Sequence, residues 1–186
     1  MIVEETGLPG VLLVCPKVYG DSRGFFMEIF NEERYSASGI LGGGLRFVQD
    51  NYSRSAHGVL RGLHFQRRHP QGKLVQVVKG AVFDVAVDIR ADSSTFGKWV
   101  GVELTEDNHH QLWVPPGFAH GFCVLSEVAD FQYKCTDFYH PEDEGGILWN
   151  DPGIGIEWPL DDPLLSAKDQ ANPCFKDAVL WDNRSS

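Results

Sequence analysis

The segment GVLRGLHFQRRHPQGK carries Arg61, His64 and Lys73 within a short, strand-like stretch broken by glycines. An imidazole can accept a proton, an ammonium can stabilise an oxyanion, and a guanidinium can bind phosphate. Two later segments add His120, in WVPPGFAHGF, and Tyr133, a potential acid, in FQYKCTDFY. Together these groups predict carbanion chemistry on an anionic substrate.

The orientation of these side chains is open. Arg61 and His64 fall on opposite sides of a regular strand, because successive side chains alternate. A β-bulge at Gly62 would bring both to one side. Each residue also has an ordinary interpretation, since a single histidine on a strand is more often structural and a lysine usually belongs to a solvated face.

A metal centre has little support. Small barrels often hold a metal with two histidines in an HxH pattern, but the position two after His64 is Gln66. His109 and His110 are adjacent, so they would point to opposite faces of a strand, and His120 has no histidine at ligand spacing. The sequence also lacks GxGxxG, GxxxxGK[ST] and GxSxG. We therefore expect chemistry without a metal or another cofactor.

Length and net charge limit the number of domains and the kinds of ligand that the protein can bind. The 186 residues, 42% hydrophobic, fit a single domain, residues 1–186, with a substantial core and short terminal extensions. The formal net charge of −10 disfavours nonspecific binding to nucleic acid or to an acidic membrane surface. An anionic ligand must then meet a local basic pocket, for which the candidates are Arg23, Arg61, Lys73 and Lys168.

The cellular setting is inferred from apolar runs and cysteines. The longest apolar runs are too short to span a bilayer, and the first residues, MIVEETGLPG, show no export signal. The four cysteines are widely spaced and include no CxxC pair, so we expect reduced thiols. These features predict a soluble, cytoplasmic protein.

Strand signals dominate the chain, as short apolar segments between turn residues. The segments are 11–14, 24–30, 47–52, 59–65, 74–78, 81–89, 99–104, 111–114, 121–124 and 131–136. Lys79-Gly80 lies between two of them and predicts a tight hairpin over 74–89. Asn31 can cap a short helix that reaches Ser38 and ends at Gly39.

This spacing predicts an all-β sandwich or barrel with few short helices, wide enough for one small ligand. Alternation over 81–88 places Phe83, Val85 and Val87 on one face. Asp84 and Asp88 share the other face with small apolar residues, where they could line a cavity or lie solvated on an open sheet.

Several separate segments resemble the dTDP-4-dehydrorhamnose 3,5-epimerase family. They are DSRGFFMEIF, FVQDNYSRS, GVLRGLHFQ, QGKLVQVVKGAVFDVAVDIR, TFGKW, QLWVPPGFAHGF, WNDP and SAKD, and they cover about residues 9–169. The resemblance implies a cupin-like jelly roll and a cofactor-independent epimerase of nucleotide sugars. It also implies a homodimer in which the N-terminal strand region reaches into the partner's sheet.

The resemblance assigns roles by matching motif. His64 would accept the proton, with Asp169 of SAKD behind its imidazole; Lys73 would stabilise an enolate at the C4 oxygen, and Tyr133 would return a proton from the other face. The residues implied to bind a dTDP-4-keto-6-deoxyhexose are Arg23, Glu28, Gln49, Asn51, Arg61, His120, Glu144 and Lys168. Glu144 is the weakest match, because its surrounding loop agrees loosely.

The leading hypothesis is inversion of C3 and C5 of dTDP-4-dehydro-6-deoxy-glucose, giving dTDP-4-dehydro-rhamnose. A relative that inverts only one carbon would share much of this residue set. The contrasting class is a cupin-like binding or metal-dependent protein in which His64 and His120 hold a ligand or an ion.

Overall fold

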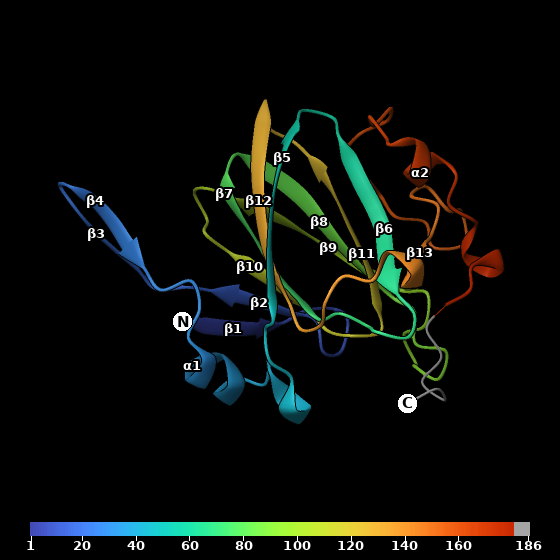
Figure 1. Ribbon diagram of the computed structural model, residues 1–186. Helices are drawn as coiled ribbons and strands as arrows, with labels where there is room; N and C mark the ends of the chain where they lie inside the picture. Colours follow the sequence, from blue (N-terminus) through green and yellow to red (C-terminus); the bar gives the residue numbers. More distant parts are fainter. Residues whose placement is uncertain (181–186) are drawn as a thin grey trace.

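Two antiparallel sheets face each other in the computed structural model, which describes residues 1–180 (Figure 1). The larger sheet has the order β1 (Ile2–Glu5), β2 (Leu12–Cys15), β10 (Gln111–Val114), β7 (Lys73–Lys79), β12 (Val128–Cys135) and β5 (Gln49–Ala56). The smaller has the order β13 (Glu144–Gly146), β6 (Leu60–Gln66), β11 (Phe118–Val124), β8 (Ala81–Asp88) and β9 (Trp99–Thr105). The all-β, jelly-roll prediction is confirmed.

The main core fills the space between the sheets. Val75 and Phe131 of the larger sheet pack there against Val82, Ala86 and Phe122 of the smaller one. The alternation predicted for 81–88 is also observed, because the opposite side chains of β8 belong to a second cluster outside the sandwich. This packing fixes the two sheets as the walls of whatever lies between them.

Two further segments cover the outer faces. The helix α1 (Glu32–Ala37) places Tyr35 against Leu74 and Trp113 of the larger sheet, and Asn31 caps it by accepting a hydrogen bond from the Arg34 amide at 3.1 Å, as predicted. The C-terminal segment, with α2 (Ala167–Gln170), runs along the smaller sheet beside β6 (Figure 1). This segment brings SAKD to the edge of the sandwich.

Every predicted strand segment overlaps an observed strand, but two strands are longer than predicted. β5 continues to Ala56 and β11 already begins at Phe118. The strands that the sequence did not predict, β1, β3 (Val18–Asp21) and β13, are short and carry glycine or charged residues. β1 and β3 each pair with the strand that directly follows them, whereas β13 pairs with β6, much earlier in the chain.

The prediction of a tight hairpin over 74–89 is wrong. β7 pairs with β10 and β12, whereas β8 pairs with β11 and β9, so the chain crosses from one sheet to the other at Gly80. Gly80 does have the expected positive φ, +79°. A left-handed glycine between two apolar strands fits such an arch as well as a hairpin, and here the inward rows of β7 and β8 face each other across the core.

The bulge that would bring Arg61 and His64 to one side is present at Gly62. Between the pairs His120–His64 and Phe122–Arg61, β6 has one residue more than β11. Gly62 has a φ of +121°, and a Cβ there would lie 2.6 Å from the Gly121 Cα. The bulge therefore requires glycine, and it turns Arg61 and His64 toward the same cavity.

One hairpin projects from the sandwich. β3 and β4 (Gly24–Met27) pair with each other and extend away from both sheets (Figure 1). The hairpin exposes Tyr19, Phe25 and Phe26, which are 56, 60 and 70% accessible. Within residues 1–180, no helix combines the length and apolar character needed to cross a membrane.

Candidate active site

A cavity lies between the two sheets, beyond the end of the apolar core. It has two adjoining lobes, of about 290 and 170 Å³, that share His64, Lys73 and Tyr133. The larger lobe adds Gln49, Asn51, Phe65, Gln66, Gln71, Tyr139 and Glu144, and the smaller adds Ser53, Arg61, His120, Gly121, Phe122 and Phe131. The three central groups predicted from sequence thus face one space.

The His64 imidazole is held by a carboxylate. Its Nε2–H donates to Asp169 Oδ1 at 2.5 Å, and Asp169 Oδ2 accepts from the Ser166 hydroxyl at 2.7 Å. Ser166 also caps α2, which positions Asp169 against β6. Burial raises the pKa of Asp169, but hydrogen bonds from His64 and Ser166 outweigh it and leave the pKa below its usual value. The carboxylate stays ionised, and the lone pair remains on His64 Nδ1.

Lys73 begins β7 at the floor of the cavity. It lies opposite Cys135 of β12 and Val114 of β10, and burial lowers the pKa of its ammonium, against the attraction of Cys135, Glu144 and Asp84. A desolvated ammonium interacts more strongly with a developing anion than one in water. Lys73 is therefore suited to stabilise an oxyanion.

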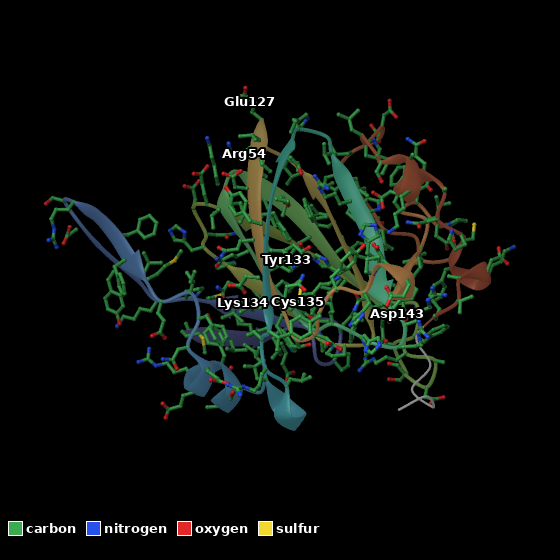
Figure 2. The ribbon with its side chains drawn as sticks, viewed as in Figure 1. Arg54, Glu127, Tyr133, Lys134, Cys135 and Asp143 are labelled. Atoms are coloured by element: carbon green, nitrogen blue, oxygen red, sulfur yellow. The ribbon has the colours of Figure 1, made fainter. Side chains whose placement is uncertain are left out.

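Tyr133 faces the cavity from the larger sheet, whereas His64 faces it from the smaller one. Figure 2 shows Tyr133 on β12, followed by Lys134 and Cys135 toward the end of the strand. Burial raises the Tyr133 pKa to about 12, although the charge of Arg61 opposes the shift. The phenol thus keeps its proton and can donate it from the opposite wall.

A second histidine–carboxylate pair lies beside the first. His120 is directly opposite His64 on the neighbouring strand, and its Nε2–H donates to Asp84 Oδ1 and Oδ2 at 2.9 and 3.0 Å. Asp84 is fully buried behind His120, while Asp88 is bound by Arg90 at the end of β8. The sequence allowed Asp84 and Asp88 either to line a cavity or to lie on a solvated sheet face. Because both are fully buried, the solvated alternative is wrong.

At the rim, Glu144 joins two other groups. Its Oε2 accepts from Lys168 Nζ at 2.5 Å and from the Tyr139 hydroxyl at 2.6 Å. Burial raises the pKa of Glu144, but the hydrogen bonds from Lys168 and Tyr139, with the charge of Lys168, bring it below its usual value. The weakest match in the sequence, Glu144, therefore does reach the cavity, and Lys168 lies beside it.

Arg23 and Glu28 do not reach the cavity of their own chain. Arg23 lies at the tip of the β3–β4 hairpin and pairs with Asp21, and Glu28 pairs with Arg34. Neither lines either lobe. Of the site residues predicted from the sequence, these two lie apart from the others within a single chain.

Some lining groups were missed from the sequence. Ser53 follows Gln49 and Asn51 on the inward face of β5, and the alternation of this strand would have revealed it had its end been placed at Ala56. Tyr139 lies on a loop, where no periodicity signals its direction. In the described part of the chain, no three His, Cys, Asp or Glu side chains are grouped as metal ligands would be.

The arrangement suits proton transfer next to a carbonyl. An imidazole on one wall can remove a proton, a phenol on the other can deliver one, and an ammonium in the same cavity can stabilise the enolate oxygen. Arg61 supplies a cation for an anionic group nearby.

Comparisons with known proteins agree with this geometry. The family model for dTDP-4-dehydrorhamnose 3,5-epimerase matches residues 5–177. The dTDP-4-dehydrorhamnose 3,5-epimerase of Salmonella typhimurium is 57% identical over 182 residues, which cover 97% of this chain and 98% of that protein.

Solved structures are similar throughout. The dTDP-6-deoxy-D-glucose-3,5-epimerase of Legionella pneumophila, in complex with dTDP-4-keto-L-rhamnose, has a TM-score of 0.91 and 55% identity, covering 94% of this chain and 93% of that one. A 3'-monoepimerase from Streptomyces bikiniensis, in complex with dTDP-quinovose, has a TM-score of 0.85 and 32% identity, covering 92 and 86%. The chain belongs to the dTDP-4-dehydrorhamnose 3,5-epimerase family.

Proposed function

We propose that this protein inverts C3 and C5 of dTDP-4-dehydro-6-deoxy-glucose and so makes dTDP-4-dehydro-rhamnose. The observation that carries this function is the convergence of His64, with Asp169 behind it, on one cavity with Lys73 and Tyr133. Its support from relatives is the high identity to 3,5-epimerases over nearly the whole chain.

In the proposed reaction, His64 removes the proton from C3 or C5, and the electron pair of the C–H bond forms an enolate whose charge lies on O4. Asp169 stabilises the imidazolium, and the Lys73 ammonium stabilises O4. Tyr133 then donates its proton to the opposite face of the carbon. The tyrosinate then regains a proton from solvent, and the His64 imidazolium loses its proton to solvent. Both groups are thereby restored to their starting states.

The remaining cavity residues would bind the nucleotide sugar. Arg61 has a free guanidinium fork suited to the diphosphate. Polar groups along the walls would hold the sugar and the nucleoside; they are Gln49, Asn51, His120, Glu144 and Lys168.

Solvent labelling tests the double inversion. With purified protein that has been dialysed against a chelator, incubation of the 4-ketosugar in D₂O should place deuterium at both C3 and C5, as read by NMR. Deuterium at only one carbon would identify a monoepimerase instead. Activity that returns only when metal is added would support the metal-dependent class.

We also propose that the protein is a homodimer in which each β3–β4 hairpin docks on the second copy. A two-stranded hairpin is marginally stable alone, and exposed aromatic side chains mark an interaction surface. The hairpin carries Phe25 and Phe26 on its strands and Arg23 at its tip. Docking would bring Arg23 and Glu28 to the partner's cavity, which explains why they do not reach their own.

A double change of Phe25 and Phe26 to aspartate tests the docking. We expect the native protein to sediment as a dimer and the variant as a folded monomer with greatly reduced activity. Val179→Asp changes an apolar residue of similar exposure, 69%, and should leave the dimer intact. A native monomer with full activity would contradict the proposal.

We infer a cytoplasmic location. All four cysteines are free thiols in the structure, which fits a reducing compartment.

A further inference from the structure

Arg61 differs from the other arginines of residues 1–180 in what it binds. Six of them form ion pairs: Arg23 with Asp21, Arg34 with Glu28, Arg46 with Glu32, Arg54 with Asp130, Arg68 with Asp143, and Arg90 with Asp88. Arg67 donates to the main-chain carbonyls of Asp143 and Glu144. Arg61 instead donates from Nε to the Ser55 hydroxyl at 3.1 Å, its one recorded side-chain hydrogen bond.

A neutral acceptor has a different effect from a carboxylate. A carboxylate would bind two nitrogens of the guanidinium and neutralise its charge, as Asp130 does with Arg54. Ser55 occupies Nε alone, so both terminal nitrogens and the full positive charge remain for a ligand. Arg61 is thus oriented without being neutralised.

Ser55 is well placed to fix this orientation. It lies on the inward face of β5, opposite Ala129 of β12, and is only 6% accessible. The Gly62 bulge turns Arg61 into the cavity from the other sheet, so the hydrogen bond joins the two walls. Ser55 is therefore held in the wall of the cavity while Arg61 stays accessible.

We propose that Ser55 is a positioning residue that aims the Arg61 guanidinium at the substrate diphosphate while leaving its charge uncompensated. The inference rests on the proposed function, because it takes the anion to be the diphosphate of a nucleotide sugar. Ser55 itself touches neither the sugar nor the phosphates in this role. It sets the affinity for the nucleotide portion through Arg61.

Four substitutions separate orientation from charge. Ser55→Ala should weaken dTDP binding about tenfold in calorimetry, because the guanidinium loses the hydroxyl that orients it. Ser55→Thr keeps the hydroxyl and should bind dTDP nearly as the native protein does. Ser55→Asn and Ser55→Asp are matched in size, and only the aspartate neutralises Arg61, so it should bind dTDP at least tenfold more weakly than the asparagine variant.

Kinetics distinguish this role from a structural one. Ser55→Ala should raise KM with little change in kcat, because substrate binding and not proton transfer is affected. Ser93→Ala is the control: it removes a hydroxyl from Arg90, which is outside the cavity and keeps its carboxylate Asp88, and should leave KM unchanged. If the alanine variant fails to fold, the asparagine and aspartate pair still decides the question.

The two proposals fail in different ways. A native protein that does not bind dTDP would overturn the proposed function. If the native protein binds dTDP and Ser55→Ala binds it with the same affinity, the role of Ser55 is overturned and the proposed function stands. Equal affinities of the asparagine and aspartate variants for dTDP would have the same consequence.

Discussion

Replacement of His64 by alanine is expected to abolish exchange of the sugar hydrogens with solvent. The variant lacks the base that forms the enolate, while the neighbouring pair of His120 and Asp84 lies on different strands and keeps its own position. Loss of a positioned base typically costs 10²- to 10⁴-fold, so we expect a decrease of about 10³-fold or more in both exchange and product formation. Proton NMR in D₂O measures both.

Two variants serve as controls for His64. His57→Ala removes an exposed histidine whose ring contacts the Leu125 carbonyl, and it should have native activity. Asp169→Asn should reduce the rate of exchange and still allow dTDP to bind, because it weakens the base without changing the phosphate site. Native exchange rates in His64→Ala would contradict the assignment.

Replacement of Tyr133 by phenylalanine is expected to separate exchange from inversion. His64 and Lys73 remain, so the enolate still forms and can recover a proton on the face from which one was lost. Delivery to the other face loses its donor, and product formation should fall about 10²- to 10⁴-fold. The burial that raises the Tyr133 pKa to about 12 keeps this donor protonated at every pH at which the assay is practical.

The measurement compares deuterium in recovered substrate with deuterium in product. Tyr52→Phe is a suitable control, since Tyr52 lies on β5 with its side chain 59% accessible. Equal and complete loss of exchange in Tyr133→Phe and His64→Ala would refute this division of roles.

The sequence predicted the strands well where burial imposes a pattern. Alternation located β8, and Asn31 located the start of α1. The prediction failed at Gly80, because a positive φ is a local property, whereas the choice between a hairpin and an arch depends on which distant strands complete each sheet. The predicted end of β5 was too early for a related reason. The outward residues of this strand are polar and its inward residues line a cavity, so neither face shows an apolar pattern.

The site was predictable to the extent that its residues lie in recognisable motifs. The partnership of His64 with Asp169 joins positions 105 residues apart and was inferred from resemblance, not from spacing. The sequence left Asp84 open between a cavity and a solvated sheet face, and its pairing with His120 depends on the register of β8 and β11. The roles of Tyr139 and Ser55 depend on a loop and on a bulge, which local sequence patterns do not fix.

The burial of Lys73 has a thermodynamic consequence. Its pKa is lower in the folded protein than in the unfolded chain, so in the pH range between the two values the unfolded chain binds more protons. The free energy of unfolding contributed by this group therefore rises with pH across that range, and burial of the charged form is a net cost to folding. Asp84, whose pKa burial raises, carries a cost of the same kind. The apolar packing of the sandwich must compensate for both costs. The cavity therefore lowers the free energy of unfolding at the positions where its chemistry requires buried charged groups.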